Sequence, residues 1–157
     1  ILDNSYVYSQ FHDQGIDSWA FANYATMNSQ TSTLTNGSGK EWKIILGNVA
    51  RNSIYPFRHV LARVAVKANA TVTATLYMKK GHGTNIVARL AYMGGQITGL
   101  ASNVYSTDLT DINEAQVTLT LNQPTVAGVI EIEIQAYCTT SATSANVIYD
   151  SLAISQT

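Results

Sequence analysis

The chain has 157 residues, of which 46% are hydrophobic and only 12% are charged, and its formal net charge is −1. This length suits one domain, residues 1–157, that buries roughly 70% of its unfolded surface. The weak net charge argues against nucleic acid or an anionic membrane as a partner. No apolar run approaches the ~20 residues that a membrane-spanning helix needs. Cys138 is the only cysteine, which excludes an internal disulfide.

The first forty residues mix aromatic and polar side chains without a clear period. A turn at Asn36–Gly37–Ser38–Gly39 then precedes a strand that we expect over Trp42–Val49. The turn does not match a phosphate-binding loop, since Leu34 stands where the first glycine is required and Glu41 where Ser or Thr is required. The chain also begins with Ile rather than Met, so we expect a processed product, an excised domain or part of a longer protein.

The clearest pattern is the alternation from Val60 to Met78, in which every even-numbered residue is small or apolar and most odd-numbered residues are polar. A period of two predicts β-strands with one buried face. We expect a hairpin with a three-residue loop, Lys67–Ala68–Asn69, because an odd loop keeps the same parity on one face. Asn69 would take the left-handed conformation, and His59 would point outward.

Further strands are expected in the second half of the chain, separated by turn residues. Gly94–Gly95 would return the chain in a tight hairpin, and the stretch from Ser102 to Ala115 would be a long surface loop with a helical turn near its end. The cleanest alternation places Glu131, Glu133, Gln135 and Tyr137 outside. The expected strands are Ile86–Tyr92, Gln96–Thr98, Val117–Leu121, Ile130–Tyr137 and Val147–Ile154.

Eight or more strands at this spacing predict an all-β, antiparallel two-sheet β-sandwich. The order of motifs also resembles the carbohydrate-binding-module-like jelly-roll domains found in glycoside-degrading enzymes and in virion structural proteins of tailed phages. The motifs are Trp19, Tyr55–Pro56, V-A-V-K-A-N, T-V-T-A-T-L-Y-M-K-K, P-T-V-A-G-V-I-E-I-E-I and V-I-Y-D-S-L-A-I. The resemblance implies a jelly roll.

The resemblance also implies a structural calcium ion near the N-terminal region. Asp13 and Asp150 are the candidate ligands, with Asp3 as a further carboxylate, because calcium prefers six to eight oxygen ligands. His12 stands where the family shows an oxygen ligand. The alternative for Asp150 is a hydrogen bond within a turn. No other cofactor is expected.

No catalytic constellation is evident. The histidines His12, His59 and His82 lack the spacing of a zinc site. Glu131 and Glu133 lie about 6–7 Å apart at strand rise, which suits a glycosidase pair. Both are expected to be solvated charges on an outward face, so the protein is predicted not to be an enzyme.

Five aromatic residues are candidates for stacking on sugar rings or for anchoring a protein interface: Trp42, Tyr77, Tyr92, Tyr105 and Tyr137. The sequence leaves both uses open. Trp42 has a third use, as a packing residue in the core of the sandwich.

Three functions remain at this point. The leading hypothesis is a non-enzymatic module of a tailed-phage virion, a capsid decoration, cement or fibre-type protein that adheres to a capsid or tail protein, associates with its own copies and resides in the extracellular particle. The alternative is a carbohydrate-binding module that recognises a polysaccharide or host glycan through exposed aromatic residues. A hydrolase would require two carboxylates that converge in a buried cleft.

Overall fold

A computed structural model describes residues 8–9, 18–21, 25–31, 34–36, 40–46, 56–82, 86–109, 113–122, 126–138 and 145–157. The regular elements in these ranges are all β-strands, and every pairing between them is antiparallel. No helix in the described part of the chain is long and apolar enough to cross a membrane. The strands are β1 (Tyr8–Ser9), β2 (Ser18–Phe21), β3 (Ala25–Thr31), β4 (Lys40–Leu46), β5 (Phe57–Val66), β6 (Val72–His82), β7 (Ile86–Tyr92), β8 (Val104–Tyr105), β9 (Ala115–Leu121), β10 (Gly128–Cys138) and β11 (Ala145–Gln156).

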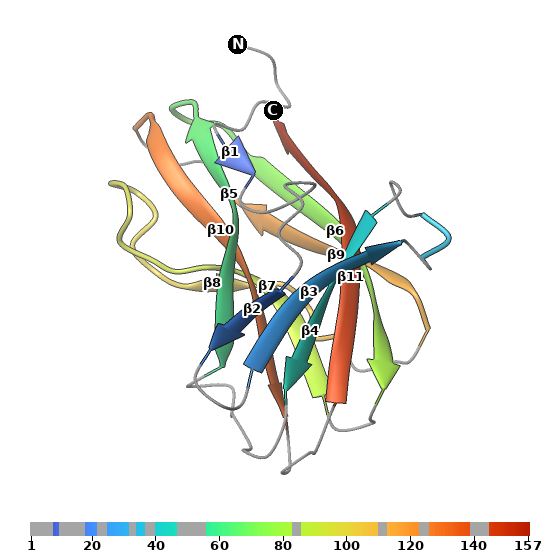
Figure 1. The fold of residues 1–157 in the computed structure, drawn as a ribbon. Helices are drawn as coiled ribbons and strands as arrows, with labels where there is room; N and C mark the ends of the chain where they lie inside the picture. The colour runs from blue at the N-terminus through green and yellow to red at the C-terminus, as the bar shows by residue number, and fades with distance from the viewer. Residues whose placement is uncertain are drawn as a thin grey trace.

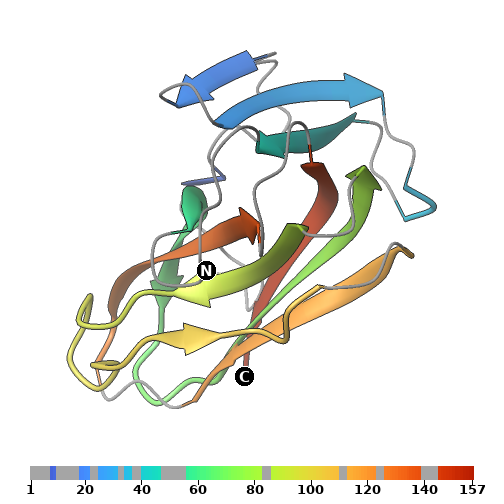
Figure 2. The ribbon, with the colours of Figure 1, turned by 90° about the horizontal axis from the view of Figure 1, so that it is seen from below.

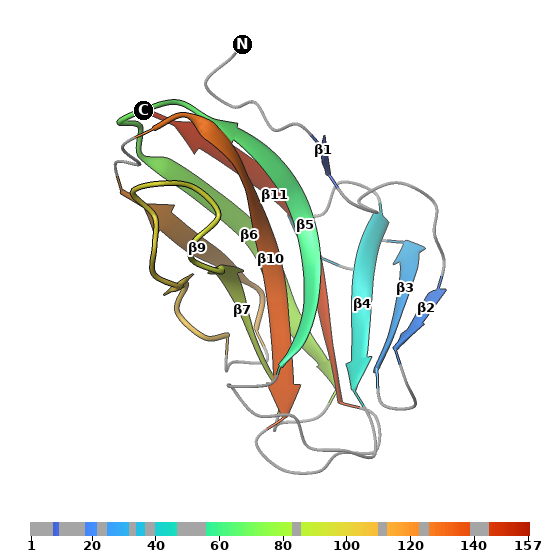
Figure 3. The same cartoon turned by 90° about the vertical axis from the view of Figure 1, so that its left-hand side faces the viewer.

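The strands form two sheets that pack face to face. The five-stranded sheet has the order β1-β5-β10-β7-β8 and the six-stranded sheet the order β2-β3-β4-β11-β6-β9 (Figure 1). In side view, β5 and β10 pass in front of β11 and β6, while β4, β3 and β2 extend to one side (Figure 3). Apolar side chains from both sheets fill the space between them. The predicted fold class, an all-β two-sheet jelly-roll sandwich, is confirmed.

The alternating segment from Val60 to Met78 supplies one strand to each sheet, so the predicted hairpin is wrong. β5 pairs with β1 and β10, whereas β6 pairs with β9 and β11. From Ala62 onward in β5 and from Val72 to Lys80 in β6 the even-numbered residues point inward, because these parts of the two strands line the same core from opposite sheets. The connection is a corner of the sandwich, and Asn69 has the predicted left-handed conformation, with φ 59°.

The C-terminus holds this corner. The Gln156 side chain, which is buried, accepts a hydrogen bond from the Lys67 backbone N–H at 2.8 Å. Its Nε2 donates to the Ala65 carbonyl oxygen at 2.7 Å. Thr157 and Thr71 exchange a pair of backbone hydrogen bonds at 2.9 and 3.0 Å. The end of β11 and the residue after it therefore tie the two sheets together where the chain crosses between them.

A β-bulge in β5 changes which side chains of its first half point into the core, so that odd-numbered residues are buried there. Ile132 of β10 lies opposite Ala62, and Glu133 lies opposite Val60, so Leu61 is the extra residue. Leu61 and Ala62 are both buried, and His59 points inward with 3% of its surface exposed. The predicted outward His59 is wrong for this reason. The same reversal places Arg58 on the outer face of the sheet.

The strand after Gly94–Gly95 begins later than predicted. Residues 93–103 form a loop, and the chain returns beside β7 at β8, where Ala91 pairs with Tyr105. Gly95 has the positive φ, 88°, that the glycine pair was expected to supply. Viewed from below, β8 lies beside β9 along one edge of the sandwich, where the two strands are in contact (Figure 2). At this edge, the last strand of the five-stranded sheet, β8, contacts the last strand of the six-stranded sheet, β9.

Candidate ligand-binding face

The outer face of the five-stranded sheet carries a connected set of polar and aromatic side chains. We call it the polar face and define it by seven residues: Arg58, Arg89, Tyr105, Asp108, Glu133, Gln135 and Tyr137. The bulge in β5 and the alternation of β10 bring the central members into one row, because Gln135 pairs with Arg58 on one side and with Arg89 on the other. The remaining members come from β10, β8 and the segment that follows β8.

Arg58 and Glu133 form a bidentate ion pair. Arg58 Nε donates to Glu133 Oε2 at 2.6 Å, and Nη2 donates to Oε1 at 2.8 Å. The Glu133 side chain is 5% exposed, whereas that of Arg58 is 52% exposed. The hydrogen bond to Glu133 is the main cause that raises the pKa of Arg58 above its ordinary value. The arginine thus covers a buried carboxylate while its own outer part meets solvent.

Gln135 links this pair to a second arginine. Its Nε2 donates to Glu133 Oε2 at 3.0 Å, and its Oε1 accepts from Arg89 Nε at 2.9 Å. Gln135 is 1% exposed and Arg89 is 8% exposed. A buried network with these mutual hydrogen bonds fixes the rotamers of its members. The guanidinium of Arg89 is therefore held in one place on the sheet.

Two tyrosine rings flank that guanidinium. Arg89 Cζ lies 4.1 Å from the ring centroid of Tyr105 and 5.5 Å from that of Tyr137, distances at which a cation interacts with an aromatic ring. Asn103 Nδ2 donates to the Tyr105 hydroxyl at 3.2 Å. Tyr105 is nevertheless 42% exposed. The ring is thus oriented from one side and open to a ligand on the other.

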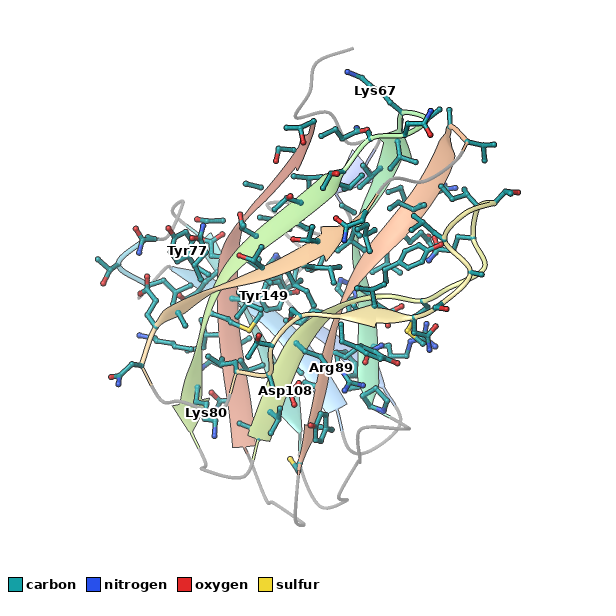
Figure 4. The ribbon with its side chains drawn as sticks, turned by 180° about the vertical axis from the view of Figure 1, so that it is seen from behind. Lys67, Tyr77, Lys80, Arg89, Asp108 and Tyr149 are labelled. Atoms are coloured by element: carbon teal, nitrogen blue, oxygen red, sulfur yellow. The ribbon has the colours of Figure 1, made fainter. Side chains whose placement is uncertain are left out.

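Tyr137 connects the row to the edge of the sandwich. Its hydroxyl donates to Asp108 Oδ2 at 3.3 Å. Burial, followed by the Asp108 carboxylate, raises the pKa of Tyr137 above its ordinary value, so the phenol stays protonated at neutral pH. Figure 4 labels Arg89 and Asp108 in the same part of the molecule, with Tyr77 and Lys67 far from them. The polar face therefore extends from Arg58 to the exposed Asp108.

The structure brings together two of the five predicted aromatic residues, Tyr105 and Tyr137. Trp42 and Tyr92 are wrong as ligand-facing residues, since they are 2% and 0% exposed and belong to the core. Tyr92 uses its hydroxyl within the protein, donating to the Leu100 carbonyl at 2.7 Å. Tyr77 is half-buried on β6, in the other sheet.

Of the predicted calcium ligands, the structure describes Asp150 alone. Asp3 and Asp13 lie outside the described residues. Asp150 is fully buried, and its Oδ1 accepts a hydrogen bond from the Ser151 backbone N–H at 2.7 Å. Among the residues described, no group of three or more His, Cys, Asp or Glu side chains is arranged to hold a metal ion. The calcium site stays a prediction.

Glu131 and Glu133 are not a pair of solvated charges. Glu131 is exposed and lies 3.8 Å from Arg63, whereas Glu133 is buried under Arg58. The expectation for Glu133 is wrong because the bulge brings an arginine over it. Each carboxylate faces its own guanidinium, an arrangement suited to structure rather than to proton transfer.

Sequence reasoning did not single out Arg58, Arg89, Gln135 or Asp108 as site residues. Alternation correctly predicts that Gln135 and Arg89 point outward from their strands. Their hydrogen bond depends on which strands are neighbours in the sheet, and alternation does not give the strand order. Alternation places Arg58 in the core because of its even number, and a regular pattern does not show the bulge that moves it to the outer face. The one available signal is the break in alternation at Phe57, an apolar residue of odd number.

No protein-family model matches the chain, and no curated protein resembles it significantly in sequence. Solved structures do resemble it in fold. The enzymatically active domain of bacteriophage CBA120 tailspike protein 4 superposes with a TM-score of 0.62 at 9% identity, over 90% of this chain and 19% of that one.

Two structures that contain carbohydrate-binding modules are also similar. The Clostridium thermocellum xylanase 10B CBM22-1 and GH10 modules, complexed with xylohexaose, give a TM-score of 0.56 at 13% identity, over 98% of this chain and 29% of that one. The CBM22-1 xylan-binding domain of Paenibacillus barcinonensis Xyn10C gives 0.52 at 11% identity, over 99% and 97%. This chain thus spans less than a third of the tailspike and xylanase 10B chains, and these likenesses show the fold.

Proposed function

We propose that the protein is a non-catalytic carbohydrate-binding domain that holds its ligand on the polar face. The observation that carries this proposal is the pair of tyrosines around Arg89, one of them 42% exposed, anchored on a buried hydrogen-bond network. An aromatic ring stacks on the apolar face of a sugar, while nearby polar groups bind its hydroxyls. The fold similarity to xylan-binding modules supports this proposal.

The network prepares the site before a ligand arrives. Glu133, Gln135 and Arg89 are fixed by mutual hydrogen bonds, and Asn103 holds the Tyr105 hydroxyl. A site whose side chains are already ordered loses less conformational entropy on binding. The tyrosines therefore act as a rigid platform.

The charges on this face favour a neutral sugar. The guanidinium groups of Arg58 and Arg89 are matched in number by the carboxylates of Glu133 and Asp108, and Arg63 beside the polar face is matched by Glu131. A face whose charges sum to zero exerts little long-range attraction on an anionic polymer. We therefore expect neutral polysaccharides to bind better than uronic-acid-containing ones.

A glycan array with isothermal titration calorimetry tests the proposal. We expect retention by a neutral β-linked chain, with xylohexaose and mixed-linked β-1,3-1,4-glucan as the first probes, and weaker retention at matched length by polygalacturonate. An array on which no glycan is retained would contradict the proposal.

A second candidate function is adhesion within a tailed-phage particle, supported by the likeness to a phage tailspike domain. The chain would then bind a capsid or tail protein, associate with its own copies and reside in the virion. Mass spectrometry of purified particles tests this candidate. A fixed, high copy ratio to a capsid or tail protein supports it, and absence from particles removes it.

A further inference from the structure

A groove of about 340 Å³ lies next to the polar face, at the edge where the two sheets meet. One wall is the segment Thr107–Leu109 that follows β8, and the other consists of residues 115–118 of β9. Figure 2 shows this edge, with β8 beside β9. The volume lies at the low end of the range of small-molecule sites, roughly 300–1,000 Å³.

The groove has an apolar floor and a polar rim. Leu109 and Val117 are 4% and 7% exposed and belong to the hydrophobic core. Asp108, Gln116 and Thr118 are exposed at the rim and offer a carboxylate, an amide and a hydroxyl. A pyranose has the matching character, since its C–H groups form an apolar face and its hydroxyls project around the edge.

Asp108 belongs to both sites. Its carboxylate accepts the hydrogen bond from Tyr137 on the polar face, and the same residue lines the groove. The Leu109 backbone N–H donates to the Ala88 carbonyl oxygen at 2.7 Å, which fixes this segment against β7. The two sites are therefore joined through a residue that the sheet holds in position.

We propose that the groove is a second sugar subsite, so that the ligand is an extended oligosaccharide that runs from Tyr105 and Tyr137 across Asp108 into the groove. This inference rests on the proposed function, because the groove would hold the next sugars of the same oligosaccharide that the polar face binds. It specifies an internal stretch of a neutral polysaccharide rather than a single terminal sugar.

The test is calorimetry of the full chain with xylo-oligosaccharides and mixed-linked β-gluco-oligosaccharides from disaccharide to hexasaccharide. We expect affinity to rise with length until both sites are filled. The double variant Gln116→Ala/Thr118→Ala should weaken hexasaccharide binding about fivefold and leave disaccharide binding unchanged, since it removes two rim hydrogen bonds. Thr120→Ala is the matched control, an exposed β9 residue outside the groove.

The outcomes separate the two proposals. Binding whose affinity does not change with length, or a double variant that behaves like Thr120→Ala, would overturn the groove subsite and leave the polar face in place. No binding of any probe by the wild-type chain would contradict the proposed function, and the subsite with it. Thermal unfolding of each variant identifies losses of affinity that come from unfolding.

Discussion

The two outer faces of the sandwich have similar backbone geometry and very different side chains. The polar face links Arg58, Glu133, Gln135 and Arg89 by direct side-chain hydrogen bonds. The opposite side carries what we call the threonine face: Thr73, Thr75, Thr118 and Thr120. On it, Thr73 pairs with Thr120 and Thr75 with Thr118 across β6 and β9.

The difference shows how a sheet surface becomes a site. The four paired threonines present small, uncharged side chains. The polar face instead uses a bulge to bring Arg58 over a buried carboxylate, and it orients two aromatic rings around Arg89. The covered carboxylate and the two oriented rings distinguish the candidate site from the threonine face.

The largest expected effect comes from breaking the ion pair. Arg58→Leu leaves the buried Glu133 carboxylate without its guanidinium and should cost about 2 kcal/mol of unfolding free energy, less than a fully buried pair because water reaches Arg58. Glu133→Leu should cost less, since Arg58 can turn into solvent. The double variant should recover part of the loss. Urea unfolding measures all three, and a greater cost for Glu133→Leu than for Arg58→Leu would contradict this account.

The next largest effect is on glycan affinity, which should depend on the polar face and not on the part of the six-stranded sheet outside the groove. Tyr105→Ala should weaken glycan affinity about tenfold or more, because the stacking surface is lost, with little change in melting temperature. Thr73→Ala, on the six-stranded sheet and outside the groove, is the control and should leave affinity unchanged. Calorimetry with the best array ligand measures both variants. Equal losses from the two substitutions would remove the assignment to the polar face.

A smaller effect is expected at the corner that joins the sheets. Asn69→Ala places an alanine at φ 59° and should cost about 1 kcal/mol, whereas Asn69→Gly should cost less, because glycine adopts this conformation without strain. Neither variant should alter ligand affinity. Chemical denaturation gives the costs, and an alanine variant as stable as the glycine variant would disprove the role of the conformation.

The smallest effect is expected on the threonine face. Thr120→Val keeps the shape of an exposed strand residue and should change stability by no more than about 0.5 kcal/mol. Glycan affinity should not change. If the virion candidate is correct, this substitution should instead reduce incorporation into particles, which quantitative mass spectrometry of particles would detect.

Alternation in the sequence predicted most strands from β5 onward, and β7 has the bounds that were expected, but the strand expected at Gln96–Thr98 is wrong because these residues lie in a loop. It predicted the left-handed Asn69, although from a hairpin that does not form, and of the aromatic candidates Tyr105 is exposed and Tyr137 half-buried. It could not assign strands to sheets, because β5 and β6 present the same parity whether they pair or face one another. The bulge at Leu61 left only the break in alternation at Phe57 as a trace, since it exists in the register between β5 and β10.

The measurement that tests the central claim most directly is backbone amide NMR of the protein titrated with the oligosaccharide that binds best in calorimetry. We predict that the perturbed amides cluster at Arg89, Tyr105, Asp108 and Tyr137, with little change at Thr73, Thr75 and Thr120. The groove inference adds residue 116 and Thr118 to the first group for long ligands alone. Perturbations confined to Thr73, Thr75 and Thr120 would contradict the assignment of the polar face as the binding site.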